Sequence, residues 1–319
     1  MPEVVDLSAR PDWFVWRNPW PSWLDRYGHV PGLQVVGNGQ RVTDLWFHRS
    51  HVCLMPDPVS APVRISTMLA GQAAVMRVEA RGIKLRPHQA EAIPFLRERK
   101  GSLLAYAPRL GKTLAAAGAH DPADGLLVVV GPLSARDVWC EWIERVHGFK
   151  PAVLTGVQDV STRGPALGTQ QAYFVHFDIL PAWTEFFAQQ LLPPARAQSD
   201  PSRRLATLVF DEIHLLASRK TKRVSASNML AAHADRIIGT SGTPMWSRPD
   251  DLYSVLHLIS PGAWGNHHAY GRHYCDGQPG AHGWAYNGVS NADELAQRLQ
   301  STILLKTWAD AVPGLPPTT

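Results

Sequence analysis

Short apolar, β-branched runs alternate with longer helical stretches along the chain from Ile83 onward. In the longer stretches the apolar residues recur with a period of about 3.6, which is the period of an α-helix. Parallel strands need a crossover connection, usually a helix, so this alternation predicts an α/β fold with a parallel sheet and helices on both faces. The expected strands are 102–106, 126–130, 172–176, 207–210 and 236–240, and the expected helices include 111–119, 135–146 and 250–258.

The first 82 residues differ from the rest, because prolines interrupt any long helix and short apolar runs indicate small strands. We predict a small N-terminal accessory module with β character over 1–82, a main lobe over 83–265, and a helical link segment and tail over 266–319. The tryptophans of the module could stack on nucleobases or could fasten the module to the lobe by apolar burial, and the second role is favoured. These residues are Trp13, Trp16, Trp20 and Trp23.

Composition excludes several classes of protein. Of the 319 residues, 45% are apolar and 18% are charged, which excludes wholesale disorder. The most apolar run, 126–130, is far shorter than the roughly 18–20 residues of a membrane span, and the N-terminus lacks the layout of a secretion signal. The three cysteines lie far apart, so we expect a reducing setting, the cytoplasm of a bacterial or phage-infected cell, with no membrane partner. The net charge of +4 permits a polyanionic partner without requiring one.

The strongest local signal is the segment 103–113, LLAYAPRLGKT, in which an apolar strand leads through a tight loop into an Ala-rich helix. Backbone N–H groups at such a helix start can bind phosphate, Lys112 adds positive charge, and the Thr113 hydroxyl can ligate Mg²⁺. The strict pattern G-x-x-x-x-G-K-[ST] fails at its first glycine, which is Tyr106 here. A simple strand-to-helix turn is the alternative.

A second signal is the segment 207–214, TLVFDEIH, in which a strand ends in two adjacent carboxylates. Asp211 can hold Mg²⁺ through its water shell, and Glu212 can polarise the water that attacks a γ-phosphate. For a lone Asp-Glu pair, a solvated acidic turn is the better interpretation. The phosphate loop on an earlier strand changes that balance, because the two segments together complete an ATP site.

A third segment, 236–259, has the order strand, Gly-Thr-Ser-Gly-Thr-Pro loop, helix. The hydroxyls of Thr240, Ser241 and Thr243, together with Gly242, could report the state of a γ-phosphate to another surface. In isolation, a plain glycine-rich turn is the favoured interpretation.

The phosphate loop, the DEIH box and SGTP, in this order, resemble the first RecA-like lobe of a superfamily 2 helicase, specifically a Swi/Snf-like DNA translocase of the annealing-helicase-like branch. Further stretches resemble that family: 85–96 its adenine-side glutamine motif, 128–146 and 173–180 its motifs Ia and Ib, and 272–317 its link segment.

The resemblance implies an enzyme, a DNA-dependent ATPase or helicase that uses ATP and Mg²⁺. It implies that Lys112, Asp211, Glu212 and His214 are catalytic and that Thr113 and Asp211 hold the metal. It further implies that Thr240, Ser241, Gly242 and Thr243 couple hydrolysis to movement on DNA. It also implies that Gln89 selects adenine. The residues that it implies bind the nucleotide with Gln89 are Pro108, Arg109, Leu110, Gly111, Lys112 and Thr113.

The family's first-lobe loops contact the phosphates of one DNA strand, so we expect sequence-tolerant binding that salt weakens. The matching positions here are Pro132, Ser134 and Phe177. Arg219 and Lys220 in the basic run 219–223 are further candidates, although a solvated surface is an equal alternative. His267, His268, His273 and Cys275 can bind metal but lack a recognised ligand spacing, so surface histidines are expected there.

Several positions depart from the family pattern. Arg109 replaces a loop glycine, so we expect a cradle less able to adopt positive φ angles. Ala217 and Ser218 stand where Lys-Asn is common, and LLKT at 304–307 stands where paired arginines are common.

The sequence shows no second RecA-like lobe, so we expect a second polypeptide to supply one, with its arginine finger. Two alternatives stay open: a non-catalytic regulatory subunit that binds nucleotide and DNA, and an RNA-directed helicase.

Overall fold

The computed structural model describes residues 13–17, 34–37, 42–48, 63–156, 170–191, 201–217, 221–242, 248–280 and 283–311. The chain divides into two compact units, Met1–Ala73 and Ala74–Thr319. The finer division predicted from the sequence, at 82/83 and 265/266, stays a prediction.

The first unit contains a four-stranded sheet with the order β2-β3-β1-β4, in which every pairing is antiparallel. Its strands are β1 (Trp13–Arg17), β2 (Gln34–Gly37), β3 (Val42–His48) and β4 (Val63–Arg64). Helix α2 (Ile65–Glu79) follows β4 directly. The β character predicted for this part of the chain is therefore present. The tryptophan side chains of the module lie outside the described residues.

The second unit is built on a seven-stranded sheet with the order β13-β5-β10-β9-β6-β8-β7, and all six pairings are parallel. The strands are β5 (Gly101–Tyr106), β6 (Leu126–Gly131), β7 (Ala152–Leu154), β8 (Ala172–His176), β9 (Leu205–Phe210), β10 (Ala234–Ser241) and β13 (Ile303–Lys306). All five predicted strands are among them.

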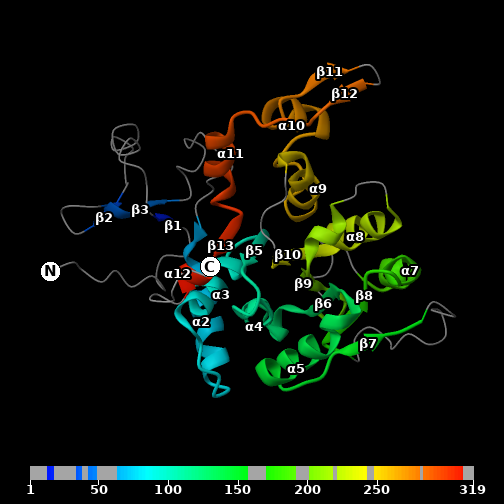
Figure 1. Cartoon of the computed structure of the whole chain (residues 1–319). Helices are drawn as coiled ribbons and strands as arrows, with labels where there is room; N and C mark the ends of the chain where they lie inside the picture. The colour runs from blue at the N-terminus through cyan, green and yellow to red at the C-terminus, as the bar shows by residue number, and fades with distance from the viewer. Residues whose placement is uncertain are drawn as a thin grey trace. The chain divides into compact units, whose positions relative to one another are not determined.

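Helices cover both faces of this sheet (Figure 1). Side chains alternate along each strand, so Leu103 and Ala105 of β5 belong to one buried cluster, and Leu104 and Tyr106 belong to the other. The first cluster continues into α7 (Leu180–Gln190), α8 (Lys222–His233) and α9 (Pro249–Ile259). The second continues into α3 (Pro87–Arg97), α4 (Lys112–Ala119) and α5 (Arg136–His147). The predicted α/β architecture is confirmed.

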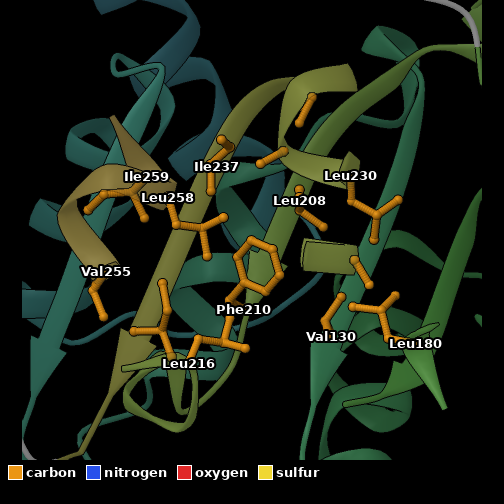
Figure 2. Packing of buried hydrophobic residues seen from close by; sticks show 14 of the residues in the cluster. Val130, Leu180, Leu208, Phe210, Leu216, Leu230, Ile237, Val255, Leu258 and Ile259 are labelled. Atoms are coloured by element: carbon orange, nitrogen blue, oxygen red, sulfur yellow. The ribbon is translucent and has the colours of Figure 1, made fainter. Parts of the chain in front are cut away.

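Figure 2 shows part of the first cluster, where Phe210 of β9 and Ile237 of β10 point toward residues of α8 and α9. Phe210 is fully buried. Burial of one such side chain stabilises the fold by roughly 1.5–3 kcal/mol, so this layer helps to hold α8 and α9 against the sheet.

The C-terminal part of the described chain returns to the sheet. It contains α10 (His267–Tyr274), the hairpin β11 (Gln278–Gly280) and β12 (Gly283–Ala285), α11 (Ala292–Leu299), strand β13 and α12 (Trp308–Ala311). Strand β13 pairs with β5, from Ile303 opposite Leu103 to Lys306 opposite Tyr106. The link segment expected to be helical therefore also adds the edge strand next to the phosphate loop.

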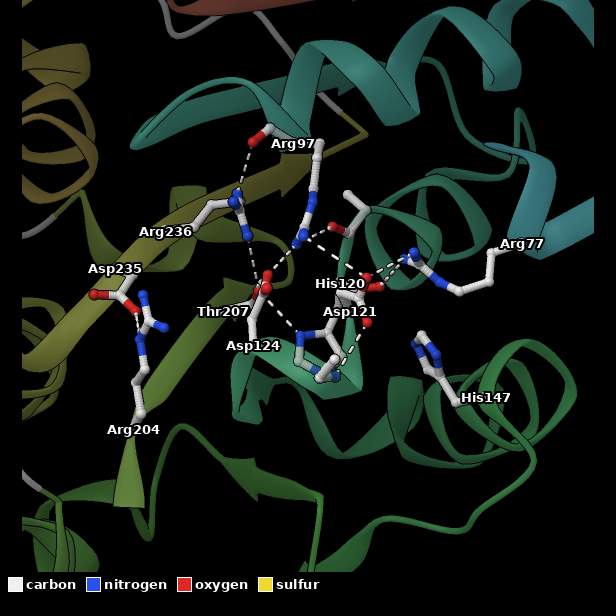
Figure 3. A network of polar contacts seen from close by, with 12 residues as sticks. Arg77, Arg97, His120, Asp121, Asp124, His147, Arg204, Thr207, Asp235 and Arg236 are labelled. Carbon is white, nitrogen blue, oxygen red and sulfur yellow. Dashed lines mark hydrogen bonds and ion pairs between the residues drawn. The ribbon is translucent and has the colours of Figure 1, made fainter. Parts of the chain in front are cut away.

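A polar network lies at the amino-terminal edge of the sheet (Figure 3). Arg97 contacts Asp124 at 2.5 Å, and Arg77 contacts Asp121 at 2.7 Å. The neighbouring His120 is fully buried. This edge is opposite the one where the strands deliver the sequence motifs.

None of the helices in the described residues is long and apolar enough to cross a membrane.

Candidate nucleotide-binding site

Three adjacent strands deliver the three sequence motifs to one edge of the sheet. Strand β10 lies between β5 and β9, with Ser241 opposite Ala105 and Gly239 opposite Phe210. Because the strands are parallel, the loop after β5, the acidic pair after β9 and the glycine loop after β10 leave the sheet side by side. Ligands of open α/β sheets bind at the carboxyl ends of the strands.

Gly242 marks the point where the three motifs meet. A Cβ atom placed on Gly242 would lie 3.3 Å from Lys112 Nζ, 3.5 Å from Glu212 Oε1 and 3.5 Å from Pro108 Cγ. The Gly242 backbone N–H also donates to Glu212 Oε2 at 3.2 Å. The structure thus brings together the lysine, the acidic residue and the glycine loop that the sequence singled out.

The phosphate loop requires two left-handed residues. Gly111 has φ +83°, and a Cβ atom there would lie 2.1 Å from Gln89 Nε2, so no side chain fits. Arg109 adopts φ +66° although it is not glycine. The sequence led us to expect that Arg109 would hinder this conformation, and the structure adopts it nonetheless, at a cost of about 1–2 kcal/mol. Lys112 Nζ donates to the carbonyl of Tyr106 at 3.2 Å across the loop.

Helix α3 contacts the phosphate loop through the side chains of His88 and Gln89. His88 Nε2 and Gln89 Nε2 lie 2.9 Å and 3.2 Å from the Leu110 carbonyl, and Gln89 Oε1 accepts from the Arg86 N–H at 3.0 Å. Both ends of the Gln89 amide are therefore engaged with backbone, and adenine selection through this amide stays a prediction. Leu110 itself is fully buried.

Tyr106, which stands in place of the strict motif's first glycine, connects the end of β5 to helix α3. It is fully buried, and its hydroxyl donates to the His88 carbonyl at 2.7 Å. Burial, assisted by the negative charge of Glu91, raises the pKa of Tyr106 above its usual value, so the hydroxyl stays a donor.

Asp211 is held by hydrogen bonds to both carboxylate oxygens. Thr240 Oγ1 donates to Oδ1 at 2.6 Å, and the indole Nε1–H of Trp139 donates to Oδ2 at 2.9 Å. Asp211 is 7% exposed and Trp139 is fully buried. Sequence reasoning missed Trp139, because a tryptophan on an apolar helix face indicates core packing and nothing in the sequence reveals its hydrogen bond.

Glu212 and His214 lie on the solvent side of Asp211. Glu212 has φ +50°, and His214 Nδ1 lies 3.3 Å from Glu212 Oε2 and 3.1 Å from Ser241 Oγ. Both side chains are about one-third exposed, so water can reach them. The acidic box and the glycine loop are thus joined by the contacts of Glu212 with Gly242 and of His214 with Ser241.

The oxygen donors at this site suit Mg²⁺. Thr113 and Asp211 offer a hydroxyl and a carboxylate, the hard ligands that Mg²⁺ accepts together with phosphate oxygens and water. Among the described residues, no group of three or more His, Cys, Asp or Glu side chains could hold a metal ion by itself. Two of the three histidines of α10 contact carboxylates, His267 with Asp250 and His273 with Glu294.

The predicted DNA-contact residues have different surroundings. Ser134 is exposed and Pro132 is partly buried, at the turn that follows β6. Phe177 is only 2% exposed and its N–H donates to the Gly131 carbonyl at 3.3 Å, so the structure places this residue in the interior and not at a DNA-contacting surface. Arg219, Lys220 and the coupling residue Thr243 lie outside the described residues.

A parallel sheet in this order, with its motifs gathered at the carboxyl edge, defines a RecA-like lobe. The family can also be named: the profile of the SNF2-related domain matches residues 88–319, and the chain belongs to that family. The resemblance found in the motifs is confirmed.

Three relatives illustrate the similarity. The SWI/SNF-related matrix-associated actin-dependent regulator of chromatin subfamily A-like protein 1 of Xenopus tropicalis is 30% identical over 70% of this chain and 22% of its own length. The Bos taurus protein of that name is 31% identical over 74% and 24%. The human DNA annealing helicase and endonuclease ZRANB3 is 27% identical over 73% and 22%. The chain thus spans less than a quarter of the length of these animal relatives, and its cellular setting stays a prediction.

A solved structure shares the fold. The Sulfolobus solfataricus SWI2/SNF2 ATPase core in complex with dsDNA aligns with 70% of this chain and 45% of its own, with a TM-score of 0.55 and 21% identity. At that identity the likeness concerns the fold alone.

Proposed function

We propose that this chain is the ATP-binding half of a DNA-dependent ATPase that couples hydrolysis of MgATP to movement on DNA. The observation that carries the proposal is the meeting of Lys112, Glu212 and Gly242 within van der Waals distance of one point. A cation, a carboxylate and a backbone N–H from three separate motifs form the constellation that phosphoryl-transfer sites use.

Each residue has a defined part in this proposal. Lys112 and the backbone N–H groups at the start of α4 bind the phosphates. Thr113 and Asp211 would hold Mg²⁺, which neutralises charge on the phosphate oxygens when bound. Trp139 and Thr240 orient the Asp211 carboxylate. Glu212, which water can reach, orients the attacking water and takes up its proton.

Coupling follows from the hydrogen bond between Glu212 and Gly242. When Glu212 turns toward a water beside the γ-phosphate, it releases the Gly242 N–H, and the glycine loop is free to shift. The contact of His214 with Ser241 transmits the same change to the end of β10. The nucleotide state thereby reaches the segment that leads into α9.

DNA binding is the second part of the proposal. A relative named as a DNA annealing helicase supports it. Exposed Ser134 after β6 is placed to contact the phosphate backbone, which carries no sequence information.

The proposal includes the participation of a second RecA-like lobe in turnover. An arginine from such a lobe would stabilise charge on the transferring phosphate, a contribution of about 10³–10⁵ in rate in related enzymes. DNA-stimulated turnover by the 319-residue chain at the rate of a two-lobed enzyme would refute this arrangement.

The experiment that tests the site is a titration with a fluorescent ATP analogue and Mg²⁺. We expect Lys112→Ala to abolish binding, because it removes the charge that faces the phosphates. We expect Glu212→Gln to bind ATP but to hydrolyse it at least about 100-fold more slowly. Equal binding by the wild type and Lys112→Ala would contradict the proposal.

A non-catalytic regulatory subunit is the second candidate, favoured by the arginine at loop position 109. It predicts nucleotide binding by the wild type with no difference in turnover between wild type and Glu212→Gln, even with a second lobe and DNA present. Comparing how strongly duplex DNA, single-stranded DNA and RNA stimulate the ATPase rate identifies the nucleic acid on which the protein acts.

A further inference from the structure

The segment 266–289, which contains α10 and the hairpin β11–β12, has an unusual chemical composition. It carries one carboxylate, Asp276, against one arginine, Arg272, and four histidines. It also presents Trp284 on β12 with 43% of its surface exposed. An exposed tryptophan alone is not unusual on a protein surface, so what matters is which side chains lie beside the ring.

Two side chains of α10 flank the Trp284 ring. The His268 ring lies edge-on to it with centroids 4.7 Å apart, and the Arg272 guanidinium lies 5.3 Å from its centroid. The two residues are four positions apart and therefore share one face of the helix. His268 is itself fixed, because its Nδ1 lies 2.7 Å from the Tyr286 hydroxyl.

Other residues attach the hairpin to the lobe. A Cβ atom on Gly271 would lie 2.4 Å from the Tyr286 ring, so α10 and the residue that follows β12 are in close contact. His267 packs edge-on against Tyr286 and also contacts Asp250 of α9 at 2.5 Å. Because this packing already holds the hairpin, the exposed ring of Trp284 is free for a ligand.

The chemistry of this surface suits single-stranded nucleic acid. An exposed indole offers a stacking face to any base, and an arginine at its side adds a cation–π contact and a charge for phosphate. The carboxylates nearest to this surface outside the segment, Asp250 and Glu294, already contact His267 and His273, so Arg272 is the charge that a phosphate would meet beside Trp284.

We infer that Trp284, with Arg272 and His268, binds an unpaired base of single-stranded DNA. This inference rests on the proposed function for its DNA substrate and adds a second contact, separate from the backbone contacts near Ser134. The surface also contacts the residue that precedes α9, because Arg248 Nη1 donates to Asn287 Oδ1 at 3.0 Å just beyond β12.

The test compares DNA affinities of the whole 319-residue chain by fluorescence anisotropy. The probes are a 20-base-pair duplex, the same duplex with a ten-nucleotide oligo(dT) extension, and oligo(dT) alone. Stacking is worth about 1–3 kcal/mol per base, so Trp284→Ala should weaken binding of the two probes with single strands by about tenfold or more. Binding of the blunt duplex should not change.

The matched control is Trp308→Ala. Trp308 is 40% exposed, and among the described residues it has no cation or ring beside it. Trp308→Ala should leave all three affinities unchanged, and Trp284→Phe, which keeps a stacking face, should recover most of the loss. Circular dichroism and nucleotide binding report whether each variant is folded.

Three results would overturn the inference. If Trp284→Ala matches Trp308→Ala, the ring does not stack on DNA, and a protein-docking role is left for this surface. If Val289→Ser, which removes the segment's other large exposed apolar side chain, weakens binding as much as Trp284→Ala, the contact is a general apolar one. If the wild type prefers neither probe with a single strand, the inference fails while duplex binding still supports the proposed function; absence of all DNA binding would contradict both.

Discussion

One of the two hydrogen bonds that orient the Asp211 carboxylate comes from an indole N–H group. Trp139 donates to Oδ2 from a fully buried position, so it is a positioning residue for the proposed metal ligand. Residues that orient a metal ligand typically contribute 10–100-fold to metal affinity. We predict that Trp139→Phe, which keeps the ring shape but loses the donor, raises the Mg²⁺ concentration for half-maximal nucleotide binding by about tenfold.

The control for that prediction is Trp142→Phe on the same helix, where the ring faces Arg145 and not the site. A purely structural role for Trp139 would lower the free energy of unfolding without moving the Mg²⁺ dependence. An unchanged Mg²⁺ dependence in Trp139→Phe would therefore contradict the positioning role.

The backbone conformation of Arg109 gives a second prediction. A side chain at φ +66° costs about 1–2 kcal/mol relative to glycine, and part of that is offset because glycine loses more freedom on folding. Arg109→Gly and Arg109→Ala remove the same guanidinium and differ only in the backbone. We predict that Arg109→Gly is more stable than Arg109→Ala by about 1 kcal/mol in urea denaturation. Equal stabilities would mean that residue 109 does not adopt the left-handed conformation in solution.

At this scale the sequence predicted the residues whose type carries their chemistry. Lys112, Asp211 and Glu212 stand at strand ends or helix starts, where the apolar or helical pattern of the adjacent residues indicates their role. Trp139 and the double use of the Gln89 amide could not be predicted, because both depend on contacts between segments more than 20 residues apart.

At the scale of helices and strands, the buried histidines of the amino-terminal edge predict a pH dependence of stability (Figure 3). Burial lowers the pKa of His147 to about 4, although its hydrogen bond to the Ala117 carbonyl opposes the shift. Burial also lowers the pKa of His120 well below its usual range, with His147 as a further cause. Both side chains are therefore neutral in the folded state.

The unfolded chain takes up these protons first, because its histidines titrate near pH 6.5. Stability is therefore complete above about pH 6.5 and decreases as the pH falls toward 4, by about 3 kcal/mol for His147 alone. We predict that His147→Gln, which keeps a donor for the Ala117 carbonyl, flattens the decrease in melting temperature over this range. A decrease as steep in His147→Gln as in the wild type would contradict this assignment.

The elements found from the sequence are those with strong apolar runs. The five predicted strands are the five inner strands of the sheet, and burial on both faces makes each of them rich in apolar residues. Strands β7 and β13 were missed because they lie at the two edges, where they are three and four residues long and only partly buried.

In the whole molecule, the order of motifs along the chain was informative because each motif follows a strand of one parallel sheet, so the motifs lie at the same edge of that sheet. Strands β5 and β9 are separated by about 100 residues, yet only β10 lies between them in the sheet. The sequence could not show that the hairpin β11–β12 leaves Trp284 exposed, since the same composition suits a buried aromatic cluster.

The proposed mode of DNA binding predicts how the affinity for duplex DNA depends on salt and on base sequence. Contacts to phosphates alone release counterions, so the logarithm of the affinity for duplex DNA should fall linearly with the logarithm of the salt concentration. Two duplexes of unrelated sequence should bind within about twofold of each other, because backbone contacts do not read bases.

Ser134→Glu should weaken duplex binding by about fivefold through charge repulsion, while Ser134→Gln, of the same size and without charge, should not. A strong preference for one sequence, or equal binding by the two variants, would show that the turn after β6 does not lie along the DNA backbone.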